Sequence, residues 1–149
     1  MISLTPLSGY ARTKHVAGVA GRVGDEILIV QRAHDEAWSP DKWALPAGGL
    51  DRDETASMAA AREIQEEVGI VCDTDSLTPI ALFYHAPPEA EDTVIHFHVF
   101  EYACEVKPEV HINYELQNYA WIRREDIGNY DLLDAEDIVL ARCFLFDKK

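Results

Sequence analysis

Apolar and polar residues alternate along much of the chain with the period of two that is typical of β-strands. Residues 14–23 are mainly small or β-branched, Gly24 and Asp25 provide a turn, and residues 26–32 are again rich in Ile, Leu and Val. Two such runs around a short turn predict a β-hairpin. The same pattern predicts further strands over residues 43–45, 77–85, 93–106 and 118–122.

A helical period replaces this pattern in residues 54–68 and 135–146. In the first segment, the positions with core spacing are Met58, Ala61, Ile64 and Val68. The candidates for its N-cap are Asp51, Asp53 and Thr55. Gly69 is placed to end it. Strands combined with two helices predict an α/β fold, with helices packed on a mixed sheet in a single domain of residues 1–149.

The first helix carries an unusual cluster of like charges. Glu63, Glu66 and Glu67 occupy positions i, i+3 and i+4, so their carboxylates project from one face. Each such pair destabilises a helix by roughly 0.2–0.5 kcal/mol unless a cation compensates it. A hard divalent cation such as Mg²⁺ would do so, and Arg62 could brace the cluster from the side. The alternative is a solvated acidic face without a ligand.

Charge is distributed unevenly along the chain, whose formal net charge is −14. Residues 1–62 carry seven basic and eight acidic side chains, whereas residues 63–149 carry six and nineteen. Such an acidic protein repels nucleic-acid backbones, which disfavours a long nucleic acid as its partner. A small polyphosphate would need metal ions to approach the acidic helix.

Length and cysteine content narrow the class further. A chain of 149 residues is long enough to bury a core. Its apolar runs are too short to cross a bilayer, and the N-terminal segment lacks the pattern of a secretory signal, so no membrane partner is expected. Cys72, Cys104 and Cys143 are odd in number and lack zinc-like spacing. They predict buried free thiols in a reducing cytoplasm.

Fixed residues around the acidic helix carry a specific signature. Gly48 is followed after five residues by Glu54 and after seven more by the run Arg62-Glu63-Ile64-Gln65-Glu66-Glu67-Val68-Gly69-Ile70. This pattern, G-x5-E-x7-R-E-U-x-E-E-x-G-U with U aliphatic, resembles the Nudix box without a substitution at any fixed position. The resemblance implies a MutT-like member of the Nudix hydrolase superfamily. It further implies the Nudix fold, a mixed β-sheet sandwiched between α-helices, and hydrolysis of a diphosphate linkage in a nucleotide.

The same resemblance implies roles for the box residues. Glu66 and Glu67 would ligate Mg²⁺, or Mn²⁺ in its place, and Glu63 would either ligate the metal or act as the general base. Glu54 would reach the metal through water or orient the helix, with Arg62 as a brace. Gly48 permits close approach of the backbone, so the Ala47 carbonyl is a further expected metal ligand.

Candidate substrate contacts lie outside the box. Arg32 ends a strand that resembles the one preceding the box in MutT-like enzymes, where an Arg contacts the nucleotide; otherwise it caps a sheet edge. Glu115 is an expected additional metal ligand or base, in a loop that we expect to be mobile. The aromatic residues Trp38, Phe83 and Tyr84 are candidates for stacking on a base, although aromatic residues more often fill cores. His96 and His98 form an H-x-H pair without a third zinc ligand, which favours a structural role.

The approach to the box leaves the substrate open. Many MutT-like proteins have Pro-Gly-Gly where this chain has Pro46-Ala47-Gly48, a variant also found in relatives that hydrolyse ADP-ribose. We expect a (deoxy)nucleoside triphosphate pyrophosphohydrolase, with ADP-ribose or dinucleoside polyphosphate hydrolysis as alternatives. A noncatalytic nucleotide-binding module is disfavoured because every box carboxylate is present. Nudix enzymes often dimerise, so a homodimer is compatible with the resemblance.

Overall fold

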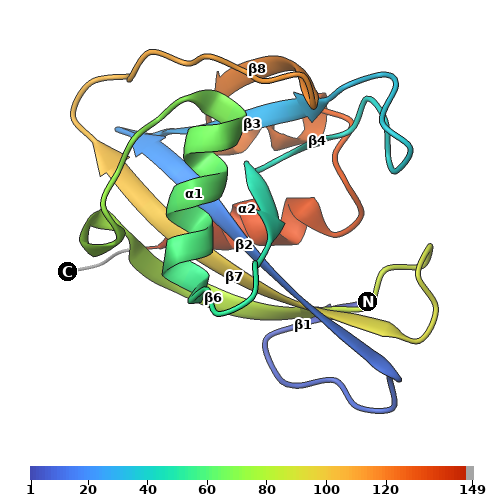
Figure 1. Ribbon diagram of the computed structural model, residues 1–149. Coiled ribbons are helices and arrows are strands. Elements are labelled where there is room, and N and C mark those ends of the chain that lie inside the picture. The colour runs from blue at the N-terminus through green and yellow to red at the C-terminus, as the bar shows by residue number, and fades with distance from the viewer. Residues whose placement is uncertain (147–149) are drawn as a thin grey trace.

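The computed structural model describes residues 1–146 and shows a mixed sheet flanked by helices (Figure 1). The strands are β1 (Ile2–Ser3), β2 (Arg12–Val23), β3 (Glu26–Arg32), β4 (Trp43–Ala44), β5 (Ala47–Gly49), β6 (Thr78–His85), β7 (Thr93–Cys104) and β8 (Leu116–Ile122). The helices are α1 (Ala56–Val68), α2 (Glu136–Leu145) and the 3₁₀ helices η1 (Thr74–Ser76) and η2 (Arg124–Asn129). The predicted α/β class with a mixed sheet is confirmed.

β2 is the strand at which the sheet divides. One edge of β2 pairs in parallel with β7 along its whole length, from Arg12 opposite Thr93 to Val23 opposite Cys104. Its other edge pairs with β5 at residues 16–18 and with β3 only at its end, where the predicted hairpin is confirmed. β3 then pairs with β8 and β4. The sheet therefore opens between β5 and β3.

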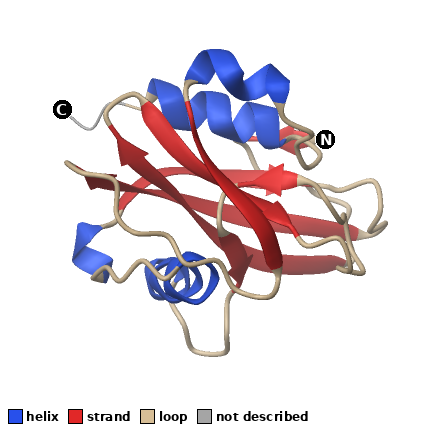
Figure 2. Ribbon diagram, turned by 90° about the horizontal axis from the view of Figure 1, so that it is seen from above, coloured by secondary structure: helices blue, strands red, loops and turns tan. Residues whose placement is uncertain are grey.

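The helices cover opposite faces of this sheet, as Figure 2 shows. Under α1, one buried cluster joins Ala60, Ile64 and Val68 to Val19 and Leu28 of the sheet. Under α2, a second cluster includes Ile27, Ile29, Phe83, Val99, Val139, Leu140 and Cys143. Alternate residues of β3 thus enter different clusters, as the period-two pattern requires.

Both ends of α1 are closed by local hydrogen bonds. Of the three N-cap candidates, Thr55 is the cap, and its hydroxyl accepts from the backbone N–H of Met58 at 3.2 Å. Gly69 ends the helix in the left-handed region, with φ of 74°, and donates to the carbonyl of Gln65. The expected core position of Met58 is wrong, since this residue is 48% exposed. Glu67, which the pattern placed on the charged face of the helix, is buried. This side of α1 lies toward the opening in the sheet.

Three short elements escaped the sequence patterns, namely β1, β5 and η1. β5 contains Ala47, Gly48 and Gly49, which have little intrinsic strand preference. It is a strand because its backbone pairs with β2. The boundaries of the other elements agree with prediction to within about two residues, the usual uncertainty of element ends.

The three cysteines are free, but only Cys143 is buried, whereas Cys72 and Cys104 are half-buried. The expectation of three buried thiols is therefore wrong for two of them. Within residues 1–146, no helix combines the length and apolar character needed to cross a membrane.

Replacing Gly69 tests the C-cap of α1. A side chain at this positive φ is strained, and a Cβ would lie 3.2 Å from Cβ of His111. We expect Gly69→Ala to lower the free energy of unfolding by about 1–2 kcal/mol in urea titrations. Gly128→Ala is the matched control, because a Cβ there meets no atom within 4 Å. Equal stability of the two variants would contradict the assigned cap.

Candidate active site

Arg62 of α1 donates hydrogen bonds to three carboxylates and lies 3.4 Å from a fourth, that of Asp51. Its Nε and Nη2 donate to Glu54 at 2.7 and 2.9 Å, and Nη1 donates to Glu63 at 2.8 Å and Glu66 at 3.3 Å. Nη2 also donates to the Gly49 carbonyl at 3.0 Å. The hydrogen bonds from Arg62, then that from the Asp51 N–H, lower the pKa of Glu54 to about 2. The guanidinium is thus a fixed cation that ties α1 to β5.

Glu67 lies on the other side of this cluster and lacks such a partner. The residue is 6% exposed, and its Oε1 accepts only a long hydrogen bond, 3.4 Å, from the Ala47 N–H. Burial, followed by the charge of Glu63, raises the pKa of Glu67 to about 9. No ion pair among residues 1–146 includes it. Glu67 is therefore a buried acid whose ionised form requires a cation.

Gly48 allows Glu63 to lie against β5. A Cβ built on Gly48 would overlap the Glu63 carboxylate, so a larger residue would push this group away. Burial also raises the pKa of Glu63, although its hydrogen bond from Arg62 opposes that shift. The glycine of the signature therefore acts by making room for a carboxylate.

Glu115 approaches the same carboxylates from the loop before β8. His111 and Asn113 donate backbone N–H groups to the carbonyls of Val68 and Glu67, at 2.8 and 3.0 Å, which fastens this loop to the end of α1. The Glu115 carbonyl accepts from the Ala33 N–H at 2.8 Å. The charge of Glu115 contributes to the raised pKa values of Glu63 and Glu67. Its backbone is thus held by hydrogen bonds on both sides, while the mobility that we expected of this loop stays a prediction.

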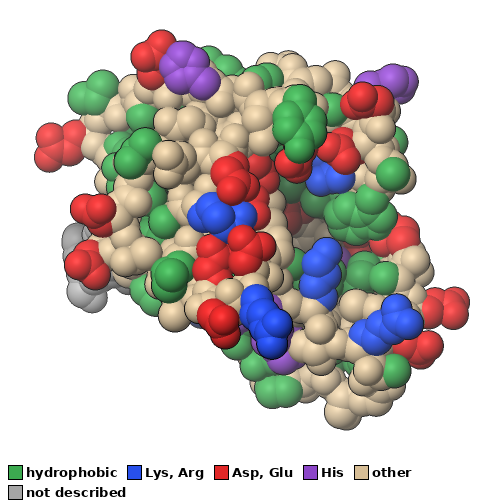
Figure 3. Space-filling model, in the orientation of Figure 1, with side chains coloured by type: hydrophobic (Ala, Val, Ile, Leu, Met, Phe, Trp, Pro, Cys, Tyr) green, Lys and Arg blue, Asp and Glu red, His purple; other side chains and the backbone are tan. Residues whose placement is uncertain are grey.

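The donor set fits a hard divalent cation in its chemistry. No three carboxylate, imidazole or thiolate groups within residues 1–146 are already arranged as metal ligands. However, Glu63, Glu67 and Glu115 are close enough for their charges to affect one another, and Arg62 compensates only Glu63 among them. Carboxylate oxygens are the ligands that Mg²⁺ and Mn²⁺ prefer. Figure 3 shows acidic side chains gathered over α1 beside a hollow in the surface.

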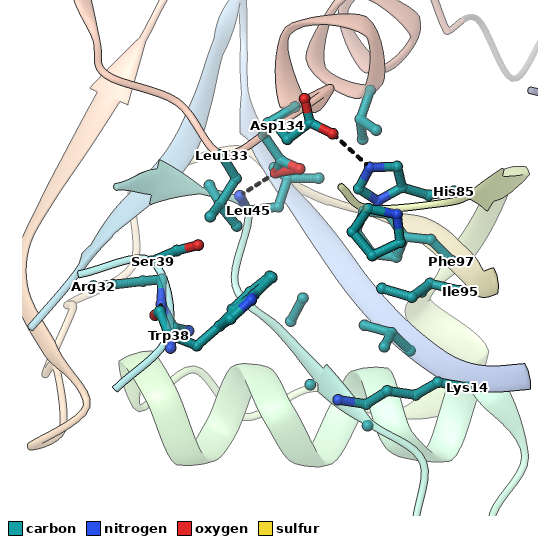
Figure 4. A pocket seen from close by; sticks show the side chains of 18 of the residues that line it. Lys14, Arg32, Trp38, Ser39, Leu45, His85, Ile95, Phe97, Leu133 and Asp134 are labelled. Carbon is teal, nitrogen blue, oxygen red and sulfur yellow. Dashed lines mark hydrogen bonds and ion pairs between the residues drawn. The ribbon is translucent and has the colours of Figure 1, made fainter. Parts of the chain in front are cut away.

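That hollow is a cavity of about 480 Å³, a volume typical of small-molecule sites. Glu67, Glu115, Ala47 and Gly48 belong to its lining, as do Lys14, Arg32 and Trp38. Figure 4 shows Arg32 and Trp38 on one side and Ile95 and Phe97 on the other. Arg32 donates from Nε to the Trp38 carbonyl at 2.9 Å, and its guanidinium lies 5.4 Å from the centre of the indole ring. Trp38 is 43% exposed, so part of its ring is accessible.

Two predicted base-stacking residues lie outside the cavity, and this expectation is corrected. Phe83 is 2% exposed and packs in the cluster under α2. Tyr84 faces the other side of β6, where its ring contacts His96 with centroids 4.8 Å apart. Neither residue lines the cavity, because the side chains of a strand alternate between faces and Phe83 is covered by its neighbours.

Several lining residues gave no sequence signal. Lys14 lies at the start of a predicted strand, where a charge normally indicates solvent. Glu136 begins α2, where an acidic residue is explained by the helix dipole alone. His85 and Asp134 are 49 residues apart, yet they form a hydrogen bond of 3.0 Å beside the cavity. The structure identifies these residues because it shows them together in the lining of the cavity.

Known proteins resemble this chain both in sequence and in fold. The NUDIX domain family matches residues 12–143. The nucleoside triphosphatase NudI of Escherichia coli strain E24377A is 33% identical over 111 residues, which cover 70% of this chain and 78% of NudI.

Solved structures with the same fold include a MutT protein from Methanosarcina mazei Go1, with a TM-score of 0.73, 24% identity and coverage of 92% and 93% of the two chains. A bifunctional NMN adenylyltransferase/ADP ribose pyrophosphatase from Francisella tularensis, in complex with AMP and an Mn ion, has a TM-score of 0.71 at 24% identity, over 91% of this chain and 42% of that chain. An Ap4A hydrolase from C. elegans has a TM-score of 0.65 at 21% identity, over 87% and 94%. Because the family match spans most of the sequence and includes α1, the chain belongs to the NUDIX domain family and is a Nudix hydrolase.

Proposed function

We propose that this protein hydrolyses a nucleoside triphosphate to a monophosphate and pyrophosphate, with Mg²⁺ as cofactor and Mn²⁺ as its alternative. The observation that carries the proposal is the buried acid Glu67, which has no ion-pair partner within residues 1–146 and lies beside Glu63 at a cavity of about 480 Å³. The identity with a nucleoside triphosphatase supports the choice of substrate. The free thiols support a reducing cytoplasm as the compartment.

Glu66, Glu67 and Glu115 would hold the cation, together with the Ala47 carbonyl, and Glu63 would either join them or act as the general base. The chemistry that a bound cation supplies is neutralisation of phosphate oxygens and a lowered pKa of coordinated water. Arg62 donates to Oε1 of Glu63, which leaves Oε2 available to accept a proton from the attacking water. Glu54 keeps Arg62 in place through two hydrogen bonds. Water then adds to the phosphorus as the bond to the leaving pyrophosphate breaks.

The cavity offers cations and one aromatic face to the substrate. Lys14 and Arg32 line it with opposite charge to the triphosphate, while the accessible ring of Trp38 offers a surface for stacking. Arg32 is already held by the Trp38 carbonyl and lies 3.6 Å from a Glu36 oxygen, so its position is set before the substrate binds. We assign Arg32 and Trp38 to substrate binding on this basis.

The second candidate is hydrolysis of ADP-ribose or a dinucleoside polyphosphate. Its support is the Pro46-Ala47-Gly48 sequence together with the fold shared with an ADP ribose pyrophosphatase and an Ap4A hydrolase. Product analysis separates these candidates. Among them, only a nucleoside triphosphate that is cleaved between its α- and β-phosphates gives a nucleoside monophosphate and pyrophosphate.

The buried acid can be tested by Glu67→Gln. Removal of this oxygen ligand should lower Mg²⁺-dependent pyrophosphate release at least about 100-fold, because even outer-shell changes at metal sites cost 10–100-fold. The melting temperature without metal should not fall, since the pKa of about 9 keeps Glu67 mostly protonated at pH 7 and the amide replaces a neutral group of similar shape. Glu125→Gln is the control, as Glu125 is an exposed acid of η2 outside the cavity. Near-normal turnover by Glu67→Gln would refute the metal assignment.

Gly48→Ala tests the space that Glu63 needs. The new methyl group would displace the Glu63 carboxylate, so we expect turnover to fall at least about tenfold, equivalent to about 1.4 kcal/mol. Gly21→Ala on β2 is the control, because its nearest contact is an ordinary 3.8 Å to Leu28. Steady-state rates with saturating Mg²⁺ provide the measurement. Equal rates for both variants would mean that Glu63 does not need its observed position.

Divalent metal should stabilise the fold through the same carboxylates. A cation binds the ionised folded site and not the unfolded chain, so at about 100 times its Kd it adds about 2.7 kcal/mol. We expect millimolar MgCl₂ to raise the melting temperature by several degrees relative to KCl of equal ionic strength, and EDTA to reverse the change. Glu67→Gln should lose most of this increase. Identical melting curves in MgCl₂ and KCl would argue against the site.

A further inference from the structure

A group of polar side chains from α2 and β6 lies at the side of the cavity remote from the acidic face of α1 (Figure 4). Glu136 comes from the first turn of α2, Asp134 from the segment before it, and His85 from the end of β6. The predicted catalytic residues do not include any of them. Since the phosphates of a nucleotide would lie near α1, this group of side chains would face its sugar and base.

Glu136 has one oxygen occupied and one available. The residue is 5% exposed, and Oε2 accepts from the Leu45 backbone N–H at 2.8 Å. Oε1 has no hydrogen-bond partner within residues 1–146. It is also not sealed from solvent, since the only fully buried side-chain N or O atom without a partner in that range is Nε2 of His98. Because Glu136 lines the cavity and Oε2 is occupied by the Leu45 N–H, we infer that Oε1 is the oxygen available to a ligand there.

A purely structural role explains only half of this arrangement. Acceptance from the Leu45 N–H needs one oxygen, which a neutral amide would supply equally well. The acid is instead retained in a site where burial, and to a lesser extent Asp137, raises its pKa to about 7. No ion pair among the described residues includes Glu136, so no cation compensates it there. A buried acceptor without a protein partner is suited to a ligand that donates hydrogen bonds.

A hydrogen-bonded contact between His85 and Asp134 holds the adjacent wall. His85 Nε2 and Asp134 Oδ2 are 3.0 Å apart, and the pair connects β6 to the segment that leads into α2. The His85 side chain is 14% exposed. The Asp134 side chain is 47% exposed, so this contact lies at the mouth of the cavity, whose lining also includes Glu136.

We propose that Oε1 of Glu136 binds the exocyclic amino group of a nucleobase, which selects cytosine over uracil and adenine over hypoxanthine. The inference rests on the proposed function, because it assumes that a nucleotide places its phosphates beside α1. Within each pair the bases differ at one exocyclic position, which is an amino group or a carbonyl group, and at the adjacent ring nitrogen, which carries a hydrogen only in uracil and hypoxanthine; the assignment places Oε1 opposite the exocyclic position. An ionised carboxylate accepts from an amino N–H and repels a carbonyl oxygen at the same place.

Binding of nucleoside monophosphates without metal tests this assignment separately from catalysis. We would measure dissociation constants of CMP, UMP, AMP and IMP by calorimetry at pH 8.5, where Glu136 is ionised. The intact protein should prefer CMP to UMP and AMP to IMP by about tenfold or more, the value of one charge-assisted hydrogen bond. Glu136→Gln keeps the acceptor for Leu45 and presents an N–H₂ donor to the cavity, so both preferences should vanish or reverse.

Asp137→Asn is the matched control, since Asp137 is the next residue of α2, is exposed and lies outside the cavity lining. It should keep the preferences of the intact protein. If Glu136→Gln does not fold, Glu136→Asp serves in its place, and its withdrawn carboxylate should weaken CMP binding about tenfold while leaving UMP unchanged.

The inference is overturned if the intact protein shows no preference for amino-bearing bases, or if Glu136→Gln retains it. Hydrolysis of all nucleoside triphosphates at similar kcat/KM would overturn base selection while leaving the proposed function intact. Conversely, an amino-base preference in binding without hydrolysis of any triphosphate would support the assignment of Glu136 and refute the proposed function.

Discussion

The close packing of α1 against β5 is the constraint on which the rest of the site depends. Gly48 leaves room for the Glu63 carboxylate, and Arg62 donates to the Gly49 carbonyl at 3.0 Å while it also binds the neighbouring acids. Without the guanidinium, the carboxylates would repel one another, and this repulsion would oppose the packing of α1 against β5. With it, three of them are ordered, and Glu67 remains buried and uncompensated at the cavity. The same charged groups, Arg62 and the carboxylates around it, therefore govern the stability of this region and would govern its affinity for a cation.

The cavity owes its position to the division of the sheet along β2. β5 occupies part of the β2 edge, and β3 pairs with only the last two residues of that strand. The sheet is therefore open between β5 and β3, and side chains on both sides of this opening face a common space. Acidic groups of α1 lie on one side of this space and polar groups of α2 on the other. A ligand with phosphates and a hydrogen-bonding base matches these two chemistries. Nucleotide chemistry is thus favoured by the distribution of polar groups within the cavity as well as by the Nudix signature.

Buried carboxylates occur at both ends of this arrangement for different physical reasons. Glu67 is surrounded by other acids, and burial together with their charges raises its pKa to about 9. Glu136 lies apart from the acidic residues of α1, and burial is the main cause of its raised pKa of about 7. The first environment favours binding of a cation, which removes the electrostatic cost of ionisation. The second favours a neutral donor of hydrogen bonds, since a single acceptor oxygen faces the cavity.

The sequence by itself determined six of the eight strands, both main helices, the fold class and the residues of the acidic helix, because these depend on local periodicity and on fixed spacing within one segment. Tertiary structure alone decided that β5 is a strand, that Met58 is exposed, and that Phe83 belongs to the core and not to the cavity. It also brought Glu136 to Leu45, 91 residues away, to complete the polar wall. Local patterns cannot specify such contacts, since each depends on the pairing of distant segments and on which face of an element another element covers.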